Sequence, residues 1–106
     1  MSYYVYILKC SDGSYYTGST SDLDRRVWEH QQGVMPTAYT HKRRPVELVW
    51  AYETERYRDA LTYERQIKGW SRAKKEALIR GDWDGIHDIV REERKRREMA
   101  TKETGK

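Results

Sequence analysis

The alternation of apolar and polar residues over residues 3–30 predicts a strand, a tight turn, a second strand and a helix. Side chains alternate between the two faces of a strand, so Tyr4 and Tyr6 share one face of the first strand. Residues 15–18 form the return strand, because β-prone residues resume there after a turn signal. The chain is therefore expected to begin with a β-hairpin that leads into a helix.

The length of the hairpin loop decides whether two tyrosines can act together. A two-residue loop over residues 12–13 would point Tyr16 to the face opposite Tyr6. A three-residue loop over residues 11–13 pairs Tyr6 with Gly18 and puts both tyrosines on one face as diagonal neighbours. That loop needs a left-handed residue at its end, which its final glycine supplies. Turn chemistry favours the three-residue loop.

The helix after the hairpin has recognisable start and stop signals. Ser21 or Asp22 can cap its beginning, and Gly33 marks its end. Arg26 and His30 are four positions apart, so they lie one above the other on one face. A single helical histidine is more often a surface or packing residue than a functional one, and for His30 both interpretations stay open.

A loop and a third strand follow. Residues 34–45 predict a loop whose basic part, Lys42, Arg43 and Arg44, is either a solvated surface or an arm that contacts phosphates. Residues 46–54 alternate well enough to predict a strand. Its apolar face would carry Val46, Leu48, Trp50 and Tyr52.

A carboxylate interrupts the apolar stripe of the next predicted helix, which runs from Arg56 to Gly69. The stripe consists of Tyr57, Ala60, Leu61, Glu64, Ile67 and Lys68. A carboxylate on a buried stripe costs several kcal/mol unless it is paired, hydrogen-bonded or bound to a metal. Glu64 is therefore expected either to form a salt bridge with a neighbouring arginine or to face a cleft as a metal ligand.

The last predicted helix, from Ser71 to Gly81, is strongly basic. Between Arg65 and Arg80 there are six Lys or Arg residues and one acid, which suggests a nucleic-acid footprint. The candidate phosphate-binding residues of the whole chain are Lys42, Arg43, Arg44, Lys68, Arg72, Lys74 and Lys75. Trp70 either packs on the core or stacks on a base. Residues 1–82 form the predicted domain, and residues 83–106 a helical extension that becomes a disordered tail.

Composition narrows the class of protein. A chain of 106 residues allows one domain, and a formal net charge of +4 favours an anionic partner. One cysteine cannot form an internal disulfide or a cysteine-based zinc site, and the three histidines are too scattered for a zinc motif. No secretory signal and no apolar run of roughly 20 residues is present, so a soluble cytoplasmic protein with no membrane role is expected.

The spacing of the tyrosines and of the later charged residues resembles a known signature. Tyr4-Val5-Tyr6 is followed by Tyr16-Thr17-Gly18, then by Arg26 and His30 on a helix, and later by Glu64. This order resembles the GIY-YIG nuclease superfamily. The match to the letters is partial, because Tyr4 replaces the first glycine and Thr17 replaces the middle isoleucine. Residues 3 to about 80 resemble small, stand-alone, single-domain bacterial members of that superfamily.

The resemblance implies a fold and a set of site residues. The fold would be α/β (α+β), with a small three-stranded, mainly antiparallel sheet flanked by helices. The resemblance implies that Tyr6, Tyr16, Arg26, His30 and Glu64 are catalytic and that Glu64 binds one divalent ion, Mg²⁺ or Mn²⁺. One hard carboxylate oxygen suits either ion, with water and phosphate completing its shell. The residues do not decide which tyrosine acts as general base.

We therefore expect a divalent-metal-dependent endonuclease that hydrolyses DNA, with repair or recombination as its setting. No second domain for target recognition is visible, so the enzyme would recognise structured or branched DNA or rely on a targeting protein. Two other interpretations stay open: a non-catalytic nucleic-acid-binding module that keeps the fold, and a structural protein with no nucleic-acid role. The sequence does not fix the oligomeric state.

Overall fold

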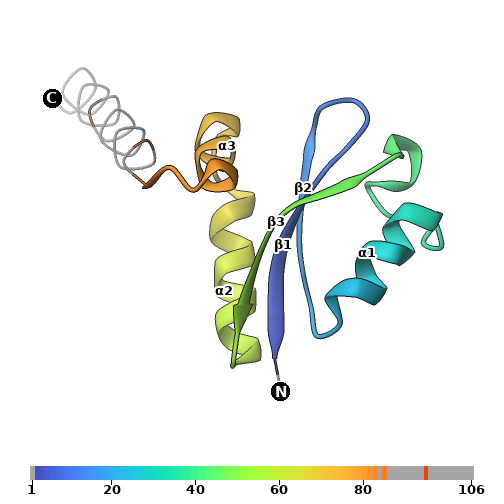
Figure 1. The fold of residues 1–106 in the computed structure, drawn as a ribbon, viewed down its shortest axis with the longest axis horizontal. Coiled ribbons are helices and arrows are strands. Elements are labelled where there is room, and N and C mark those ends of the chain that lie inside the picture. Colours follow the sequence, from blue (N-terminus) through green and yellow to red (C-terminus); the bar gives the residue numbers. More distant parts are fainter. Residues whose placement is uncertain (1, 84, 86–94, 96–106) are drawn as a thin grey trace, which may run out of the picture. The chain divides into compact units, whose positions relative to one another are not determined.

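The computed structural model of this protein describes residues 2–83, 85 and 95 (Figure 1). Its elements are β1 (Tyr3–Lys9), β2 (Tyr15–Thr20), α1 (Leu23–Gln32), the 3₁₀ helix η1 (His41–Arg43), β3 (Glu47–Thr54), α2 (Tyr57–Lys68) and α3 (Arg72–Arg80). The chain separates into two compact units, Met1–Trp70 and Ser71–Lys106, and each is described by itself. The predicted extension over residues 83–106 lies almost entirely outside the described residues. Within the part of the chain that is described, no helix is long and apolar enough to cross a membrane.

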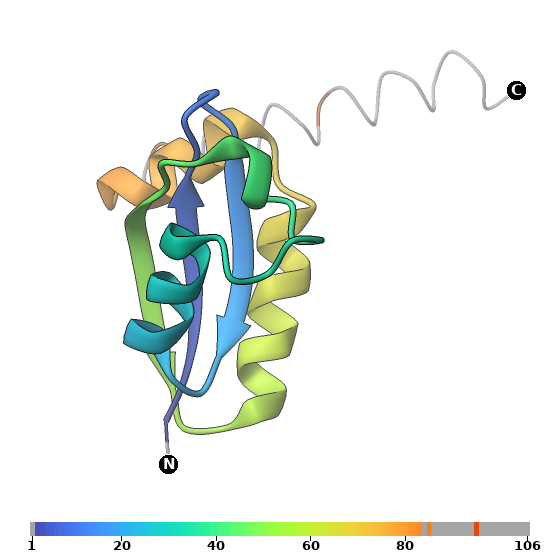
Figure 2. The ribbon, with the colours of Figure 1, turned by 90° about the vertical axis from the view of Figure 1, so that its right-hand side faces the viewer.

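The first unit is built on a three-stranded antiparallel sheet with the strand order β2-β1-β3. Helix α1 covers one face of this sheet, and α2 covers the other face and contacts all three strands (Figures 1 and 2). Strand β1 is therefore buried in the middle, whereas β2 and β3 are edge strands. The predicted fold class is confirmed.

The hairpin between β1 and β2 has the predicted three-residue loop. Tyr6 pairs with Gly18 and Leu8 pairs with Tyr16, which is the register that such a loop imposes. Gly13, at the end of the loop, has a φ of 84°, in the left-handed region that glycine adopts at low cost. Both tyrosines consequently lie on the α1 side of the sheet.

Strand β3 does not present one continuous apolar face. The prediction that a single face carries Val46, Leu48, Trp50 and Tyr52 is wrong. Trp50 pairs with Ile7, and the next residue of β1, Leu8, pairs with Leu48, so Val49 forms a bulge. Consecutive residues of β1 point to opposite faces, and so do their partners. The bulge therefore leaves Leu48 on the α1 side and turns Trp50 to the α2 side.

Each face of the sheet has its own buried core. On the α1 side, the cluster consists of Tyr6, Leu8, Cys10 and Val46, with Tyr16, Leu23 and Val27 packed against it. On the α2 side, the buried apolar residues are Val5 and Ile7 of β1 and Ala60 and Ile67 of α2. Only part of the predicted stripe on α2 is thus buried, because Tyr57 and Lys68 are exposed.

The predicted helix boundaries are confirmed at the capping residues. The side chain of Asp22, rather than that of Ser21, accepts a hydrogen bond from the backbone N–H of Arg25 at 3.1 Å, and α1 ends at Gly33. In the second unit, Ser71 caps α3 and Gly81 ends it. These short-range signals act within one turn of helix, so they can be predicted without tertiary structure.

Candidate functional site at the edge strand

Tyr6 and Tyr16 lie side by side on the α1 face, with ring centroids 6.3 Å apart. Tyr6 is completely buried and reaches from β1 across the neighbouring strand β2. It passes so close to Gly18 that a Cβ atom there would lie 2.5 Å from the Tyr6 hydroxyl oxygen. Gly18 therefore leaves the space through which Tyr6 extends toward the edge of the sheet.

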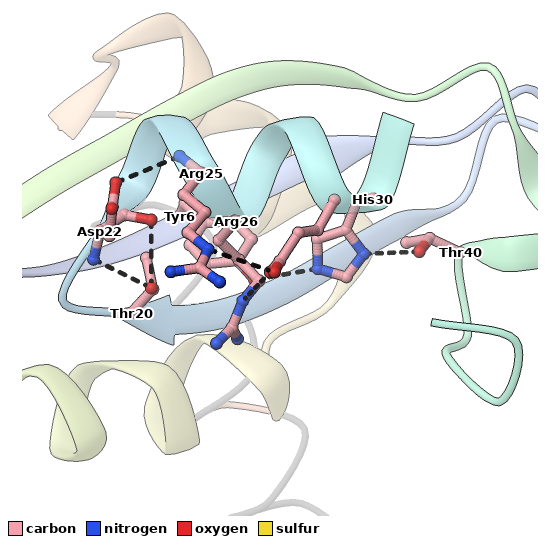
Figure 3. Close-up of polar contacts among 8 residues, drawn as sticks. Tyr6, Thr20, Asp22, Arg25, Arg26, His30 and Thr40 are labelled. Atoms are coloured by element: carbon pink, nitrogen blue, oxygen red, sulfur yellow. Dashed lines mark hydrogen bonds and ion pairs between the residues drawn. The ribbon is translucent and has the colours of Figure 1, made fainter. Parts of the chain in front are cut away.

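His30, on α1, connects Tyr6 to the loop that follows the helix through two hydrogen bonds. Its Nε2 atom lies 3.2 Å from the Tyr6 hydroxyl, and its Nδ1 atom lies 2.6 Å from the Thr40 hydroxyl (Figure 3). All three side chains are buried. A neutral imidazole has one N–H donor and one acceptor, so this chain of hydrogen bonds satisfies both ring nitrogens. The interpretation of His30 as an exposed surface residue is thereby excluded.

Sequence reasoning missed Thr40. It lies in the aperiodic loop between α1 and β3, where no spacing rule connects a residue to a helix. Sequence reasoning also missed Tyr39, whose ring stacks on Tyr16 at a centroid distance of 6.1 Å. Arg43 covers Tyr39, with its guanidinium carbon 3.8 Å from the ring centroid.

Burial sets the protonation states of Tyr6 and His30. Burial raises the pKa of Tyr6 well above its usual range, and the nearby Tyr16 raises it further, while the charge and hydrogen bonding of Arg26 lower it. Burial lowers the pKa of His30, and the positive charge of Arg26 adds to this effect, whereas Glu29 acts in the opposite direction. The resting pair is therefore a neutral phenol that is hydrogen-bonded to a neutral imidazole.

Arg26 lies one helical turn before His30 on α1 (Figure 3). Its Nε atom donates to Glu29 at 3.2 Å, and its side chain keeps part of its surface exposed. Its charge lowers the pKa values of both Tyr6 and His30, so the guanidinium lies close to both groups. The predicted alignment of Arg26 and His30 on one helix face is confirmed.

Glu64 approaches the same edge strand from α2, on the opposite face of the sheet. Its carboxylate accepts a short hydrogen bond from the hydroxyl of Ser19 on β2 and lies 2.6 Å from the ammonium of Lys68. Its negative charge also contributes to the raised pKa of Tyr6. The two tyrosines, Arg26 and Glu64 therefore gather around β2, with one face supplying the tyrosines and arginine and the other the carboxylate.

The contacts of Glu64 bear on its two predicted roles, a salt bridge to an arginine and a metal ligand. Burial acts to raise the pKa of Glu64, but hydrogen bonds from Lys68 and Ser19 outweigh it, and the pKa is lowered. The salt-bridge partner is a half-exposed lysine, not the expected arginine. No cluster of three or more metal-ligating side chains occurs among the described residues. A single ionised carboxylate nevertheless fits Mg²⁺, which keeps several waters and needs only one or two carboxylates alongside substrate phosphates.

A pocket of about 250 Å³ opens at the end of β2, next to this cluster. Its lining residues come from both strands of the hairpin, from α1 and from α2: Tyr3, Ser19, Thr20, Ser21, Arg26, Tyr57 and Ala60. Arg26 is the one predicted site residue that lines it, and Ser19 connects it to Glu64. Tyr6 and His30 are buried and do not line the pocket.

The candidate phosphate-binding residues divide between the two units. Lys42, Arg43, Arg44 and Lys68 belong to the first unit, and Arg72, Lys74 and Lys75 belong to the second. Arg43 has a structural role as well, because its Nε atom lies 3.2 Å from Asp12 in the hairpin loop. Burial lowers the pKa of Lys75. The assignment of all seven residues to phosphate binding stays a prediction.

These features define a class of protein: a small α+β domain in which a tyrosine pair, a histidine, an arginine and a glutamate surround the edge strand of a three-stranded sheet. Comparison with known proteins assigns the family. The sequence model of the GIY-YIG catalytic domain matches residues 2–77, and the chain belongs to that family.

The relatives are similarly small. The chain is 46% identical over 81 residues to the UPF0213 protein BH0048 of Halalkalibacterium halodurans, covering 74% of this chain and 83% of that protein. It is 47% identical over 79 residues to a UPF0213 protein of Staphylococcus aureus, covering 74% and 95%. The solution NMR structure of the protein EF2693 from E. faecalis is 36% identical, with a TM-score of 0.54 and coverage of 76% and 85%. The resemblance found in the sequence is thereby confirmed.

Proposed function

We propose that this protein is an endonuclease that hydrolyses DNA phosphodiester bonds with one divalent cation, Mg²⁺ or Mn²⁺. The observation that carries the proposal is the gathering of Arg26, the Tyr6–His30 pair and Glu64 around β2 within a GIY-YIG catalytic domain. Hydrolysis of a phosphodiester needs charge neutralisation at the phosphate and a group that accepts the proton of the attacking water. These residues supply both requirements.

Arg26 and Tyr16 form the part of the cluster that a phosphate can reach, because both side chains are partly exposed while Tyr6 and His30 are buried. The guanidinium of Arg26 carries a permanent charge and a planar set of donors that matches phosphate oxygens. Its ion pair with Glu29 holds the side chain in place. In this proposal, Arg26 binds the phosphate that is cleaved.

The Tyr6–His30 pair is assigned to proton uptake. A phenol with a raised pKa does not lose a proton by itself near neutral pH, but a neutral imidazole can accept one. The tautomer in which Nδ1–H donates to Thr40 leaves Nε2 free to accept the Tyr6 hydroxyl proton, while the Tyr6 oxygen takes the proton of the attacking water. Thr40 is then a positioning residue that selects the tautomer of His30.

Glu64 would hold the divalent cation, and Lys68 would leave the carboxylate when the cation binds. When bound, such a cation neutralises charge on the transferring phosphate and lowers the pKa of coordinated water. Lys68 is half exposed and can return to solvent at little cost.

We further propose that repair or recombination is the setting, with structured or branched DNA, or a targeting protein, setting the cleavage site.

A nicking assay on plasmid and branched DNA tests this function, with and without Mg²⁺ or Mn²⁺. Cleavage by the wild-type chain is expected only with the metal. Glu64→Gln should abolish cleavage and metal affinity but leave DNA binding intact, whereas Glu55→Gln, an exposed control, should cleave normally. DNA binding without cleavage under every metal condition would overturn the endonuclease and favour the binding module.

The stability of Glu64→Gln provides a second readout. Its ion-pair partner is half exposed, so loss of the pair should lower the free energy of unfolding by no more than about 1 kcal/mol. This is smaller than the ~3–5 kcal/mol expected if a buried arginine were left unpaired. Added Mn²⁺ should raise the melting temperature of the wild-type chain but not of the variant. Equal stabilisation of both chains by Mn²⁺ would refute the assignment of Glu64 as a metal ligand.

A further inference from the structure

The pocket at the end of β2 has an aromatic wall that the proposed chemistry does not use. Tyr57, at the start of α2, is 58% exposed, and its ring packs against that of Tyr3 in a tilted arrangement with a centroid distance of 5.5 Å. Both rings line the pocket together with Arg26. An exposed tyrosine held by a second ring is a ready stacking surface for a planar group.

The rest of the pocket is polar and favours a negatively charged ligand. The consecutive residues Ser19, Thr20 and Ser21 bring three hydroxyl groups to its lining, and Arg26 brings a positive charge. Helix α2 also begins here, and in the described structure its N-cap residue, Arg56, makes no side-chain capping hydrogen bond. The first backbone N–H groups of a helix carry a partial positive charge that attracts anions.

The size of the pocket limits what can enter it. Its volume of about 250 Å³ is below the roughly 300–1,000 Å³ of sites for drug-sized ligands. It therefore suits one nucleoside-sized group, with an aromatic wall for the base and hydroxyl groups and Arg26 for the sugar and phosphate. A base inside a duplex already stacks on both neighbours, so it can meet Tyr57 only when it leaves the stack.

We infer that this pocket binds one unpaired nucleotide of the DNA substrate, stacked on Tyr57, next to the phosphate held by Arg26. The inference rests on the proposed function and specifies its substrate: DNA that carries an unpaired or extruded base beside the cleaved bond. It also assigns a binding residue, Tyr57, that lies outside the five predicted catalytic positions.

Three labelled DNA probes test the inference in a chelator, so that binding is measured without cleavage. They are a short paired duplex, the same duplex with one unpaired thymidine, and the same duplex with an abasic residue in place of that thymidine. The wild-type chain should bind the thymidine bulge most tightly. Tyr57→Ala should weaken that binding about 5- to 150-fold, which is the usual effect of losing one base–aromatic stack, and should leave the other two probes unchanged.

Two variants serve as comparison. Tyr57→Phe keeps the ring and should retain the preference for the bulge. Tyr63→Ala is a matched control, because Tyr63 lies on the same helix, is 39% exposed and packs against Tyr52 outside the pocket. If Tyr57→Ala fails to fold, Ser21→Leu provides the test, because it places an apolar side chain at an exposed residue of the pocket lining and should remove the bulge preference.

Each outcome separates this inference from the proposed function. Equal affinity of the wild-type chain for the bulge and the abasic bulge would overturn the inference that the pocket binds an unpaired nucleotide. An equal loss of affinity for all three probes in Tyr57→Ala would overturn it as well. Cleavage in Mg²⁺ or Mn²⁺ with no bulge preference would support the endonuclease activity and refute nucleotide binding in the pocket. A bulge preference that depends on Tyr57, without cleavage under any condition, would establish the pocket and remove the endonuclease.

Discussion

Replacing Gly18 with alanine tests the close approach on which the site is built. The new Cβ atom would lie 2.5 Å from the hydroxyl oxygen of Tyr6, 2.7 Å from its Cζ atom and 3.1 Å from a ring carbon of Tyr16. The nearest contact is about 0.9 Å shorter than the 3.4 Å at which ordinary contact begins. Tyr6 cannot rotate away, because it is fully buried in the core and hydrogen-bonded to His30.

The expected cost follows from two effects. Overpacking a filled core costs typically about 1–3 kcal/mol. Displacing the Tyr6 hydroxyl also weakens its hydrogen bond to His30, which adds about 1 kcal/mol. Gly18→Ala should therefore lower the free energy of unfolding by about 2–4 kcal/mol and the melting temperature by roughly 10–30 °C.

Chemical and thermal denaturation of the wild-type chain and four variants measures this effect. Gly69→Ala is the matched control, because the nearest neighbour of its Cβ would be the carbonyl oxygen of Gln66 at 3.6 Å, and it should be nearly neutral. In the Tyr6→Phe background, Gly18→Ala should cost about 1 kcal/mol less, because the closest atom is gone. A Gly18→Ala chain as stable as the wild type, with no coupling to Tyr6, would refute the close approach.

Three further changes probe other parts of the site. Thr17→Val should raise the free energy of unfolding by about 1 kcal/mol in urea titrations, because the buried Thr17 hydroxyl has no hydrogen-bond partner in the described structure; lower stability would contradict this. The pKa of His30 is lower in the folded chain than in the unfolded chain, so at mildly acidic pH the unfolded chain binds more protons. The free energy of unfolding should therefore fall as the pH drops through about 6.5. His30→Gln should lose this slope in melts between neutral and mildly acidic pH, a window above the one in which carboxylates with lowered pKa values, such as Glu64, titrate. Thr40→Val should cancel the tautomer preference of His30 in nitrogen NMR spectra, and an unchanged tautomer would remove Thr40 as a positioning residue.

Much of the site could be predicted because it depends on short-range geometry. The loop of the first hairpin is fixed by a glycine that adopts a left-handed conformation, and this loop sets the register that puts Tyr6 and Tyr16 on one face. Helical spacing aligned Arg26 with His30. Glu64 stood out because a charge on an apolar stripe requires a partner.

The features that the sequence did not predict depend on contacts between distant parts of the chain. The bulge at Val49 turns Trp50 and Leu48 to opposite faces, and a bulge depends on how β3 pairs with a strand some forty residues earlier. Thr40 meets His30 only because an aperiodic loop folds back onto α1.

The sequence by itself determined the order of the elements, their caps and the hairpin register, because each depends on contacts within a few residues. Only the tertiary structure decided that Glu64 arrives from the opposite face of the sheet, that its charge is balanced by Ser19 and Lys68, and that Tyr57 and Arg26 share a pocket. Those facts depend on which helix covers which face and on how far a side chain reaches past an edge strand. Periodicity along the chain describes the faces of single elements and carries no information about the distances between them.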